Sequence, residues 1–515
     1  MATNIDVSAA WQYHDSTKHS YRSVYGSRHF LDWSNQPIPY KIYSTLQPIL
    51  LPTDFPPSAV PALDAIAGIP LPPPDERIPD LLTLARLCFF SNGITKRIRY
   101  PQGEIAFRAA ACTGALYHIE IYLVCGDLPD LPAGVYHYGA HDHGLRQLRS
   151  GDFRQVLVEA TGAEPSIVHA PVVAISTSTF WRNAWKYQAR AYRHSFWDDG
   201  TILANLLAVA TAQRMPARVV LGFADDAVNQ LLDVDPDKEA AISLIALGHT
   251  AQTPPPAPPV APLALPTVPL SRREVEYPAI RQMHAASSLA SGYEAAAWRG
   301  VLPWPPSPIP TGPLVPLRPL PASDLPTDPI EVVIRRRGST RRFAQAPITF
   351  EQLSTALDRS TRGIPADFLG AGADSLNQAY LIVNAVDGLG SGAYVFHRER
   401  RTLELLKRGN FRGEAGELAL GQDLGADAAV NVYFLADLGP ILARFGNRGY
   451  RAAQLDAAIT AGKLYLAAYA LGFGATGLTF FDDDVTAFFS PHAAGKSVLF
   501  LETLGQPLKR RRTAV

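Results

Sequence analysis

The segment Arg335–Phe343, which reads RRRGSTRRF, concentrates side chains that bind anions. Several guanidinium groups, a hydroxyl and a glycine on a short turn suit an anion of fixed geometry, above all a phosphate. The segment is expected between a short helix at Ile330–Ile334 and a second helix from Thr349. A basic run is usually only a solvated surface, but the embedded Gly-Ser-Thr and the flanking helices favour a binding site. The candidate residues are Arg337, Ser339 and Arg341.

Two glycine-containing segments favour close approach of the backbone to a ligand. Arg108–Val124 reads RAAACTGALYHIEIYLV, and small residues such as these, when they stand at a helix start, leave backbone N–H groups free for a polar ligand. Leu471–Phe481 reads LGFGATGLTFF and follows an apolar helix, where glycine permits close approach, although a helix C-cap explains the same pattern. The candidate residues are Cys112, Thr113, Gly114, Ala115, Thr476, Gly477 and Leu478.

Lys186 and Tyr187 place an amine beside a phenol, two groups that can exchange protons. A lysine acts as a base only if its pKa falls below the ordinary value of about 10.4. Arg190 and Arg193 follow closely, and their positive charge is expected to lower that pKa. Lys-Tyr pairs are common, so this pair gains weight only from its surroundings.

The order of expected elements recurs in the two halves of the chain. A helix, two β-rich runs and a strongly apolar helix are expected at residues 80–90, 118–124, 172–176 and 201–212, and again at 350–357, 380–386, 429–436 and 457–470. Arg190-Ala191-Tyr192-Arg193 is matched by Arg448-Gly449-Tyr450-Arg451, and Gly134–Tyr138 by Gly392–Phe396. Two copies of one α+β unit explain these matches. A duplicated unit packs as a pseudo-twofold pair, with the apolar helices expected at the central seam.

Proline marks the boundary between the two copies. Residues 253–269 and 302–321 are proline-rich, and proline lacks an N–H and fixes φ, so neither segment continues a helix or a central strand. We therefore predict a first domain at 1–250, an extended connector at 251–328 and a second domain at 329–515. One short helix is expected inside the connector, at Arg281–Arg299.

Composition and charge exclude several classes of partner. The chain has 515 residues, and Lys plus Arg equals Asp plus Glu at 47 each, which gives no sign of a nucleic-acid or acidic-membrane partner. No apolar run reaches the roughly 20 residues that span a bilayer, and residues 1–15 do not resemble a secretory signal. Three sparse cysteines indicate reduced thiols and a cytoplasmic protein. Their spacing fits no zinc site, and His137, His141 and His143 are expected on a hairpin, so no metal is predicted.

Taken together, the motifs resemble the nitroreductase family of flavoproteins. Arg337, Ser339, Arg341 and Phe343 match its R-x-S-x-R-x-F opening, which holds the flavin phosphate and ribityl chain. Arg108–Val124 is similar to the R-x-x-P-S-x-G-A-L-Y segment that faces flavin across the dimer interface. The resemblance also places Thr476–Leu478 against the reactive edge of the isoalloxazine, where a backbone N–H points at flavin N5.

Within that family, Trp185-Lys186-Tyr187 and the R-x-Y-R that follows resemble the SagB/ThcOx-type dehydrogenases, which oxidise azolines in peptides to azoles. The N-terminal pieces Tyr13-His14, Thr17–Ser20 and His29–Trp33 look like the opening of these tandem proteins. The resemblance implies FMN, hydride transfer through flavin N5, a peptide or small-molecule substrate, and a proton-handling role for Lys186 and Tyr187.

Two other functions stay open. NAD(P)H-dependent reduction of nitro compounds or quinones uses the same cofactor and is excluded by nothing in the sequence. A flavin-free scaffold partner in a biosynthetic complex is the rival class, because Ala111, Cys112 and Gly338 depart from the family pattern.

We expect one FMN per chain, because only one of the two seams between the copies carries every binding part. In the other seam, the helix start would be Gly372-Ala373-Asp374, which brings in a carboxylate. Arg444 and Phe445 stand there in place of Lys186 and Tyr187, and the nearest counterpart of the basic loop is Lys18–Arg22. Because the two copies supply both sides of the cleft, no partner is obligatory, and further self-association stays open.

Overall fold

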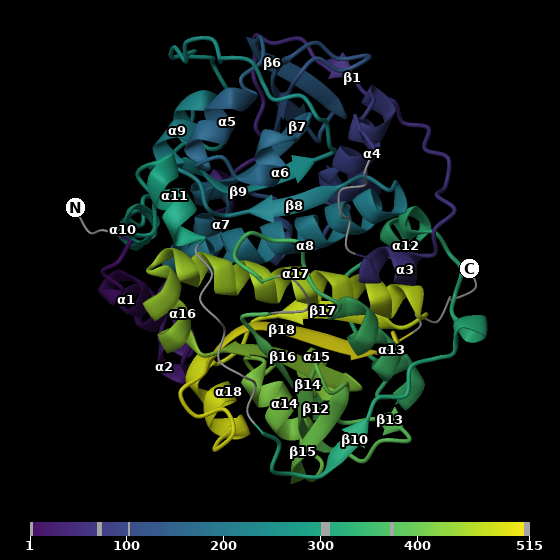
Figure 1. Cartoon of the computed structure of the whole chain (residues 1–515). Coiled ribbons are helices and arrows are strands. Elements are labelled where there is room, and N and C mark those ends of the chain that lie inside the picture. The colour runs from purple at the N-terminus through teal and green to yellow at the C-terminus, as the bar shows by residue number, and fades with distance from the viewer. Residues whose placement is uncertain (1–3, 69–74, 101–102, 300–308, 371–374, 509–515) are drawn as a thin grey trace.

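The structure, a computed structural model, describes residues 4–68, 75–100, 103–299, 309–370 and 375–508. Two seven-stranded sheets lie in opposite halves of the molecule (Figure 1), and neighbouring strands in both are antiparallel. The first sheet has the order β1 (Ile49–Leu50), β6 (Gly144–Ser150), β5 (Gly134–Gly139), β4 (Ile119–Cys125), β7 (Val172–Thr179), β9 (Glu239–Leu247), β8 (Ala217–Val220). The second has the order β10 (Leu314–Pro316), β15 (Thr402–Arg408), β14 (Gly392–His397), β12 (Gln378–Val383), β16 (Val430–Ala436), β18 (Ser497–Gly505), β17 (Gly474–Leu478).

The two sheets repeat one topology, which confirms the predicted duplication and the α+β class. In each copy a hairpin, β5–β6 or β14–β15, pairs with the strand of the same sheet that precedes it in the chain, β4 or β12. The last strand of each copy, β9 or β18, lies between the edge strand that precedes it in the chain, β8 or β17, and the rest of the sheet. The central strands β7 and β16 are buried along their whole length because helices cover both faces of each sheet.

Helices repeat in the same order. The first copy has α1 (Ser8–Ser16), α2 (Tyr21–Tyr25), α3 (Ala62–Ala67), α4 (Leu81–Asn92), α5 (Arg154–Ala160), α6 (Pro165–Val168), α7 (Phe180–Tyr187), α8 (Ala191–Ala212) and α9 (Asp225–Leu232). The second has α10 (Pro278–Ala286), α11 (Gly292–Trp298), α12 (Ile330–Arg336), α13 (Phe350–Ser360), α14 (Arg412–Leu418), α15 (Asp423–Asp427), α16 (Leu438–Phe445), α17 (Arg448–Ala470) and α18 (Asp482–Phe489). Two-stranded pairs are β2 (Ile94–Tyr100) with β3 (Gly103–Arg108), and β11 (Ile348–Thr349) with β13 (Val386–Asp387).

The apolar helices α8 and α17 pack against each other at the centre of the molecule, as predicted (Figure 1). Gly200 of α8 lies against Ala458 of α17, and Ala204 lies against Gly462. These are equivalent positions of the two copies, so the pseudo-twofold axis crosses the helix pair there. A β-carbon at Gly462 would meet that of Ala204 at 2.6 Å, so the glycines permit the close helix contact.

Both helices begin earlier than predicted. α8 starts at Ala191, directly after its N-cap Arg190, and α17 starts at Arg448, so the R-x-Y-R motifs form the starts of the helices and do not precede them. Apolar periodicity alone does not predict these helix starts, because the arginines of the R-x-Y-R motifs interrupt the apolar pattern. No helix in the described part of the chain is long and apolar enough to cross a membrane.

The predicted connector contains elements of the repeat. β10 occupies the same edge position as β1, and α10 makes the same kind of contacts as α1. The single helix expected at Arg281–Arg299 is wrong, because two helices, α10 and α11, form there. The Ser287 hydroxyl bonds back to the carbonyl oxygen of Met283 at 2.6 Å, and Ser291 caps α11, so serines end one helix and start the next.

Candidate functional site

The basic loop after α12 is fixed by two tyrosines of α17. Tyr465 donates its hydroxyl to Ser339 Oγ at 2.9 Å, and Tyr469 donates to the carbonyl oxygen of Gly338 at 2.5 Å. The backbone N–H of Thr340 donates to the carbonyl oxygen of Ala475 at 2.9 Å, which joins the loop to β17. The first two arginines of the run belong to α12, so the loop itself begins at Arg337.

Arg337 and Arg341 have different roles in this loop. Arg337 crosses to the first copy, where its Nε donates to the carbonyl oxygen of Ala109 at 3.0 Å and its Nη2 to that of Arg108 at 3.3 Å. Arg341 is exposed, and within the described ranges no side chain or carbonyl binds its guanidinium. Arg337 therefore links the two domains across the seam, while the Arg341 guanidinium is available to an anion.

The Cys112–Tyr117 segment is a left-handed turn and not the predicted helix start. Thr113–Ala115 forms a single 3-10 turn, and φ is positive at Gly114 (64°), Ala115 (55°) and Tyr117 (48°). The predicted helix is wrong because β4 begins at Ile119 and draws the chain into the sheet.

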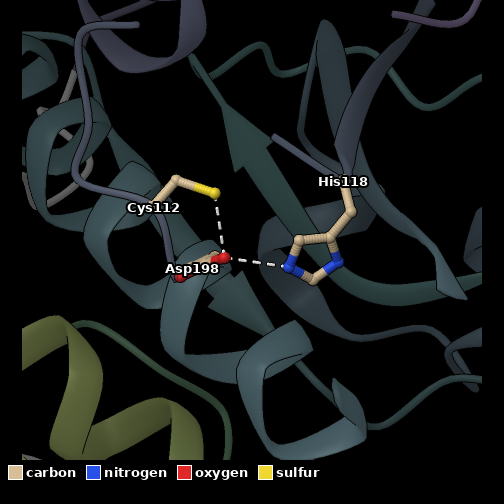
Figure 2. Close-up of side chains that lie close together, drawn as sticks. All are labelled: Cys112, His118 and Asp198. Carbon is tan, nitrogen blue, oxygen red and sulfur yellow. Dashed lines mark hydrogen bonds and ion pairs between the residues drawn. The ribbon is translucent and has the colours of Figure 1, made fainter. Parts of the chain in front are cut away.

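Asp198 of α8 holds this turn (Figure 2). Its Oδ1 accepts from the Thr113 backbone N–H at 2.8 Å and from the Thr113 hydroxyl at 2.7 Å. Its Oδ2 is 3.0 Å from Cys112 Sγ and 2.9 Å from His118 Nε2. Because α8 lies at the centre of the molecule, Asp198 fixes the turn to the seam.

Gly114 brings the turn against the Lys-Tyr pair. A β-carbon at Gly114 would lie 2.8 Å from the Tyr187 hydroxyl oxygen, so both this space and the positive φ require glycine. Lys186 and Tyr187 form the last turn of α7, and Lys186 Nζ lies 5.3 Å from the centre of the Tyr187 ring. Burial raises the pKa of Tyr187, so this phenol stays protonated at neutral pH.

Aromatic contacts connect the Lys-Tyr pair to the glycine-containing segment of the second copy. The ring of Tyr187 meets His194 at 4.6 Å between centroids, and His194 meets Trp197 at 4.8 Å. Trp197 then meets Phe500 of β18 at 5.6 Å, and the Phe500 ring lies beside Gly477. The four predicted parts of the site therefore converge on one seam.

Thr476–Leu478 belong to strand β17 and not to a loop, because they pair with β18. Gly477 lies opposite Glu502, which sequence reasoning missed. Glu502 is fully buried, and neither carboxyl oxygen has a hydrogen-bond partner among the described residues. Burial raises the pKa of Glu502 well above its ordinary value, against the opposing charge of Arg337, which favours the uncharged carboxyl. A single glutamate in an apolar strand gives no sequence signal that it will lie buried opposite Gly477.

A family model described as "Nitroreductase family" matches residues 70–249 and 334–492, one region in each copy. This chain belongs to the nitroreductase family. A crystal structure of an Anabaena variabilis protein assigned as a nitroreductase superposes with a TM-score of 0.73 at 27% identity, covering 97% of this chain and 99% of that chain. A Methanocaldococcus jannaschii protein, also assigned as a nitroreductase, is 26% identical over 169 residues, which are 33% of this chain and 80% of the relative. The chain is thus an oxidoreductase of a typically flavin-dependent family, with two tandem nitroreductase domains.

The two R-x-Y-R motifs of this chain bind aspartates across the seam. Arg190 and Arg193 contact Asp482 of the second domain at 3.0 and 2.7 Å. Arg448 and Arg451 contact Asp225 of the first domain at 2.6 and 2.8 Å. All six groups are buried. Arg190 and Arg193 therefore do not give Lys186 the uncompensated positive charge that the sequence suggested, since Asp482 neutralises them.

The N-terminal segment completes this clamp. The carbonyl oxygen of His14 accepts from Arg193 Nη2 at 2.6 Å, and Thr17 Oγ1 accepts from Arg193 Nε at 3.0 Å. On the opposite side, His284 and Ser287 of the second copy make the same two contacts with Arg451. The N-terminal motif therefore has a structural role that the sequence did not explain.

A second recurring motif supplies the two aspartates. Phe223-Ala224-Asp225-Asp226-Ala227-Val228 and Phe480-Phe481-Asp482-Asp483-Asp484-Val485 share the pattern F-x-D-D-x-V. Both follow an edge strand, and each presents its first aspartate at the start of a helix. The recurrence of this acidic pattern in both halves is the sequence signal that identifies the two aspartates.

The clamp predicts a loss of stability in acid. Burial alone would raise the pKa of Asp225, but Arg448 and Arg451 outweigh it and hold the pKa at about 2, below the ordinary 3.8. A depressed folded-state pKa stabilises the protein above the unfolded value, so this contribution is lost as pH falls from about 4 to about 2. Across that pH window the free energy of unfolding, measured with urea, should fall by about 2 kcal/mol more in the wild type than in Asp225→Asn. Equal losses in the two proteins would contradict this assignment.

In the reciprocal seam, β8 is covered by the chain itself. β8 occupies the position of β17, but Val219 N–H donates to the carbonyl oxygen of Pro365, and Asp367 N–H donates to that of Val219. The Asp367 carboxylate accepts the N–H groups of Leu221 and Gly222, each at 2.8 Å. The backbone that would face a second flavin is therefore already bonded.

The counterparts of the Lys-Tyr pair in the second domain, Arg444 and Phe445, are also engaged by other parts of the chain. Trp298 Nε1 donates to the carbonyl oxygen of Phe445 at 2.8 Å, and the two rings meet at 5.2 Å. Arg444 lies 4.6 Å from the centre of the Phe445 ring, which repeats the Lys186–Tyr187 arrangement without the phenol. Gly372-Ala373-Asp374 lies outside the described residues.

The proposed counterpart of the basic loop, Lys18–Arg22, is wrong. Lys18 pairs with Asp15 and Asp483, and Ser20 caps α2, so this segment belongs to the N-terminal clamp. The positional counterpart follows α3, because Pro61 before α3 bridges Pro329 before α12. Residues 68–74 there read GIPLPPP and contain no basic side chain, and of them only Gly68 is described.

Proposed function

We propose that this chain is an FMN-dependent dehydrogenase of the SagB/ThcOx type, with one FMN per chain in the seam that contains Lys186 and Tyr187. The observation that carries the proposal is the convergence of four parts from two domains: the basic loop, the Gly114 turn, the Lys-Tyr pair and β17. The covered β8 and the absence of basic residues from 68–74 support a single cofactor.

The residues of the seam fit FMN in kind. Arg341 offers an unpaired guanidinium to the phosphate, and Ser339, whose oxygen accepts from Tyr465, keeps its own O–H free to donate to a phosphate oxygen. Gly114 and Gly477 are exposed and lack side chains, so a planar ring can approach the backbone on either side. The neutral Glu502 adds no negative charge beneath β17, where a carboxylate would oppose reduction of the ring system.

Oxidation of an azoline to an azole removes one hydride and one proton from the substrate. Bound FMN supplies the hydride acceptor, at N5. Lys186 takes the proton as the C–H bond breaks, and the protonated Tyr187 donates a hydrogen bond to a ring heteroatom. Gly114 has no side chain and so leaves room for the Tyr187 hydroxyl beside the turn.

Flavin content tests the cofactor site. The purified protein should contain one FMN per chain by absorbance, and Arg341→Ala should weaken FMN binding by about 10- to 100-fold, because a charge-assisted phosphate contact contributes about 1.5–3 kcal/mol. Arg342→Ala is the matched control, since Arg342 is also exposed but stands at a position that the motif leaves unspecified, and should keep full flavin. Two FMN per chain, or a colourless protein that does not take up added FMN, would refute the proposal.

Anaerobic flavin bleaching separates the two candidate reactions. A synthetic thiazoline-containing peptide should reduce the flavin of a dehydrogenase. Bleaching by NADPH alone, followed by reoxidation with menadione or a nitroaromatic, would instead favour the reductase function that the family name suggests.

A further inference from the structure

Three metal-ligating atoms meet beside the seam, two from the segment 112–118 and one from helix α8 (Figure 2). They are Cys112 Sγ, His118 Nε2 and Asp198 Oδ2, and the ligand atoms of these residues lie within 4.8 Å of one another. His118 is fully buried and Asp198 nearly so, while Cys112 is partly exposed. The thiol comes from the turn, the imidazole from the start of β4 and the carboxylate from α8.

Each ligand is held from its far side by a second partner. The backbone N–H of Tyr117 donates to Cys112 Sγ at 3.1 Å, and His118 Nδ1 lies 2.9 Å from Ser178 Oγ. Thr113 occupies the other oxygen of Asp198 through both its N–H and its hydroxyl. Outer contacts of this kind orient metal ligands, and a histidine that binds metal through one nitrogen bonds an outer partner through the other.

A chain of hydroxyls lies behind His118 and can accept the proton of its Nδ1. Ser195 Oγ lies 3.3 Å from the carbonyl oxygen of Ala191 and 2.9 Å from Ser178 Oγ, which lies 2.9 Å from His118 Nδ1, so Ser178 can donate to Ser195 and accept from Nδ1. An uncharged imidazole with its proton on Nδ1 then presents the Nε2 lone pair to Asp198 Oδ2. A cation between these two atoms satisfies both.

The equivalent aspartate of the second domain binds its neighbours without a thiol or an imidazole. Asp456, the equivalent of Asp198, accepts from Ser375 Oγ at 2.6 Å, from Leu376 N–H at 2.9 Å and from Asn377 Nδ2 at 2.8 Å. Hydroxyl, amide and backbone donors therefore satisfy this aspartate among the described residues before β12. The aspartate is present in both copies, whereas the thiol and the imidazole occur only beside the seam assigned to FMN.

We propose that Cys112, His118 and Asp198 form a divalent metal site, and that zinc is the metal. A mixed sulfur, nitrogen and oxygen set suits Zn²⁺, and three protein ligands leave the fourth tetrahedral position for water or a substrate atom. Binding displaces the thiol proton and brings the imidazole in uncharged form. Zinc bonds of about 2.0–2.3 Å require the present separations to widen by roughly 0.5 Å.

This proposal is independent of the proposed function, because metal and flavin are measured separately in the same full-length protein. After chelation and incubation with Zn²⁺, followed by gel filtration, elemental analysis should give one zinc per chain with or without FMN. Cobalt substitution should produce a visible thiolate-to-metal absorption band. Cys112→Ser keeps a hydroxyl donor to Asp198 and should abolish that band.

Two further variants complete the test. His118→Gln should reduce zinc affinity at least 10-fold, and Ser178→Ala about 10- to 100-fold, the usual cost of losing an outer partner. Cys88→Ala removes a buried thiol outside the cluster and should retain one zinc. Less than a tenth of a zinc per wild-type chain would show that the cluster is purely hydrogen-bonded and overturn the proposal, whatever the flavin content. So would a zinc content in Cys112→Ser and His118→Gln equal to that of the wild type.

Discussion

Replacing Asp482 with alanine should lower the free energy of unfolding by about 3–5 kcal/mol, because it leaves two arginines buried without a counter-charge. Arg190 and Arg193 are almost inaccessible, and both contact this carboxylate. Burial would raise the pKa of Asp482, but the two guanidiniums outweigh it and lower the pKa below its ordinary value. The clamp lies between the domains, so the variant should also release FMN at lower urea concentrations than those that unfold the wild type.

Asp483→Ala is the matched control for this prediction. Asp483 follows Asp482 directly, but its side chain is 78% exposed and, among the described residues, its ion pair is with Lys18, so its removal should cost at most about 1 kcal/mol. Asp225→Ala should match the larger effect, since it removes the equivalent carboxylate. Urea unfolding followed by tryptophan fluorescence measures all three. Similar stability of Asp482→Ala and Asp483→Ala would show that the buried arginines find other partners.

The duplication and the fold were predictable because each copy keeps the same local patterns. The apolar helices, the G-x-Y hairpins and the R-x-Y-R motifs recur in order, and the second seven-stranded sheet repeats the topology of the first. The apolar character of both central helices also correctly placed them at the seam. Local periodicity carries this information since a helix or strand must bury one face whatever its partner is.

The details of the site depended on contacts between segments far apart in sequence. The predicted helix start at Thr113 became a left-handed turn because Asp198, on another helix, binds its N–H and hydroxyl. The glycine-rich segment became β17 because β18 offers a ladder of hydrogen bonds, and such pairing overrides weak local preference. Asp367 and the covering of β8 have no local signal at all, since their partners belong to the other domain.

Removing the Lys186 amine should slow flavin reduction by a thiazoline peptide about 10²- to 10⁴-fold, the usual contribution of a positioned general base. The residue lies on the last turn of α7 beside Tyr187, and the pair contacts the Gly114 turn through the phenol. Lys186→Ala should keep its FMN, because no predicted phosphate contact involves this lysine. Reduction by NADPH should change little, since hydride transfer from a nicotinamide needs no base for a carbon-bound proton.

Two variants decide whether the effect belongs to proton transfer. Tyr187→Phe removes only the hydroxyl and should slow the peptide reaction less than Lys186→Ala, because the phenol stays protonated and donates a hydrogen bond. Arg444→Ala, at the equivalent position of the second domain, should leave the rate unchanged, because Trp298 packs on Phe445 in that seam. Stopped-flow flavin bleaching at matched flavin content gives all three rates. If Lys186→Ala reacted with the peptide as fast as the wild type, or lost the same factor with NADPH, the lysine would have no role as a base, and the azoline dehydrogenase function would lose its main support.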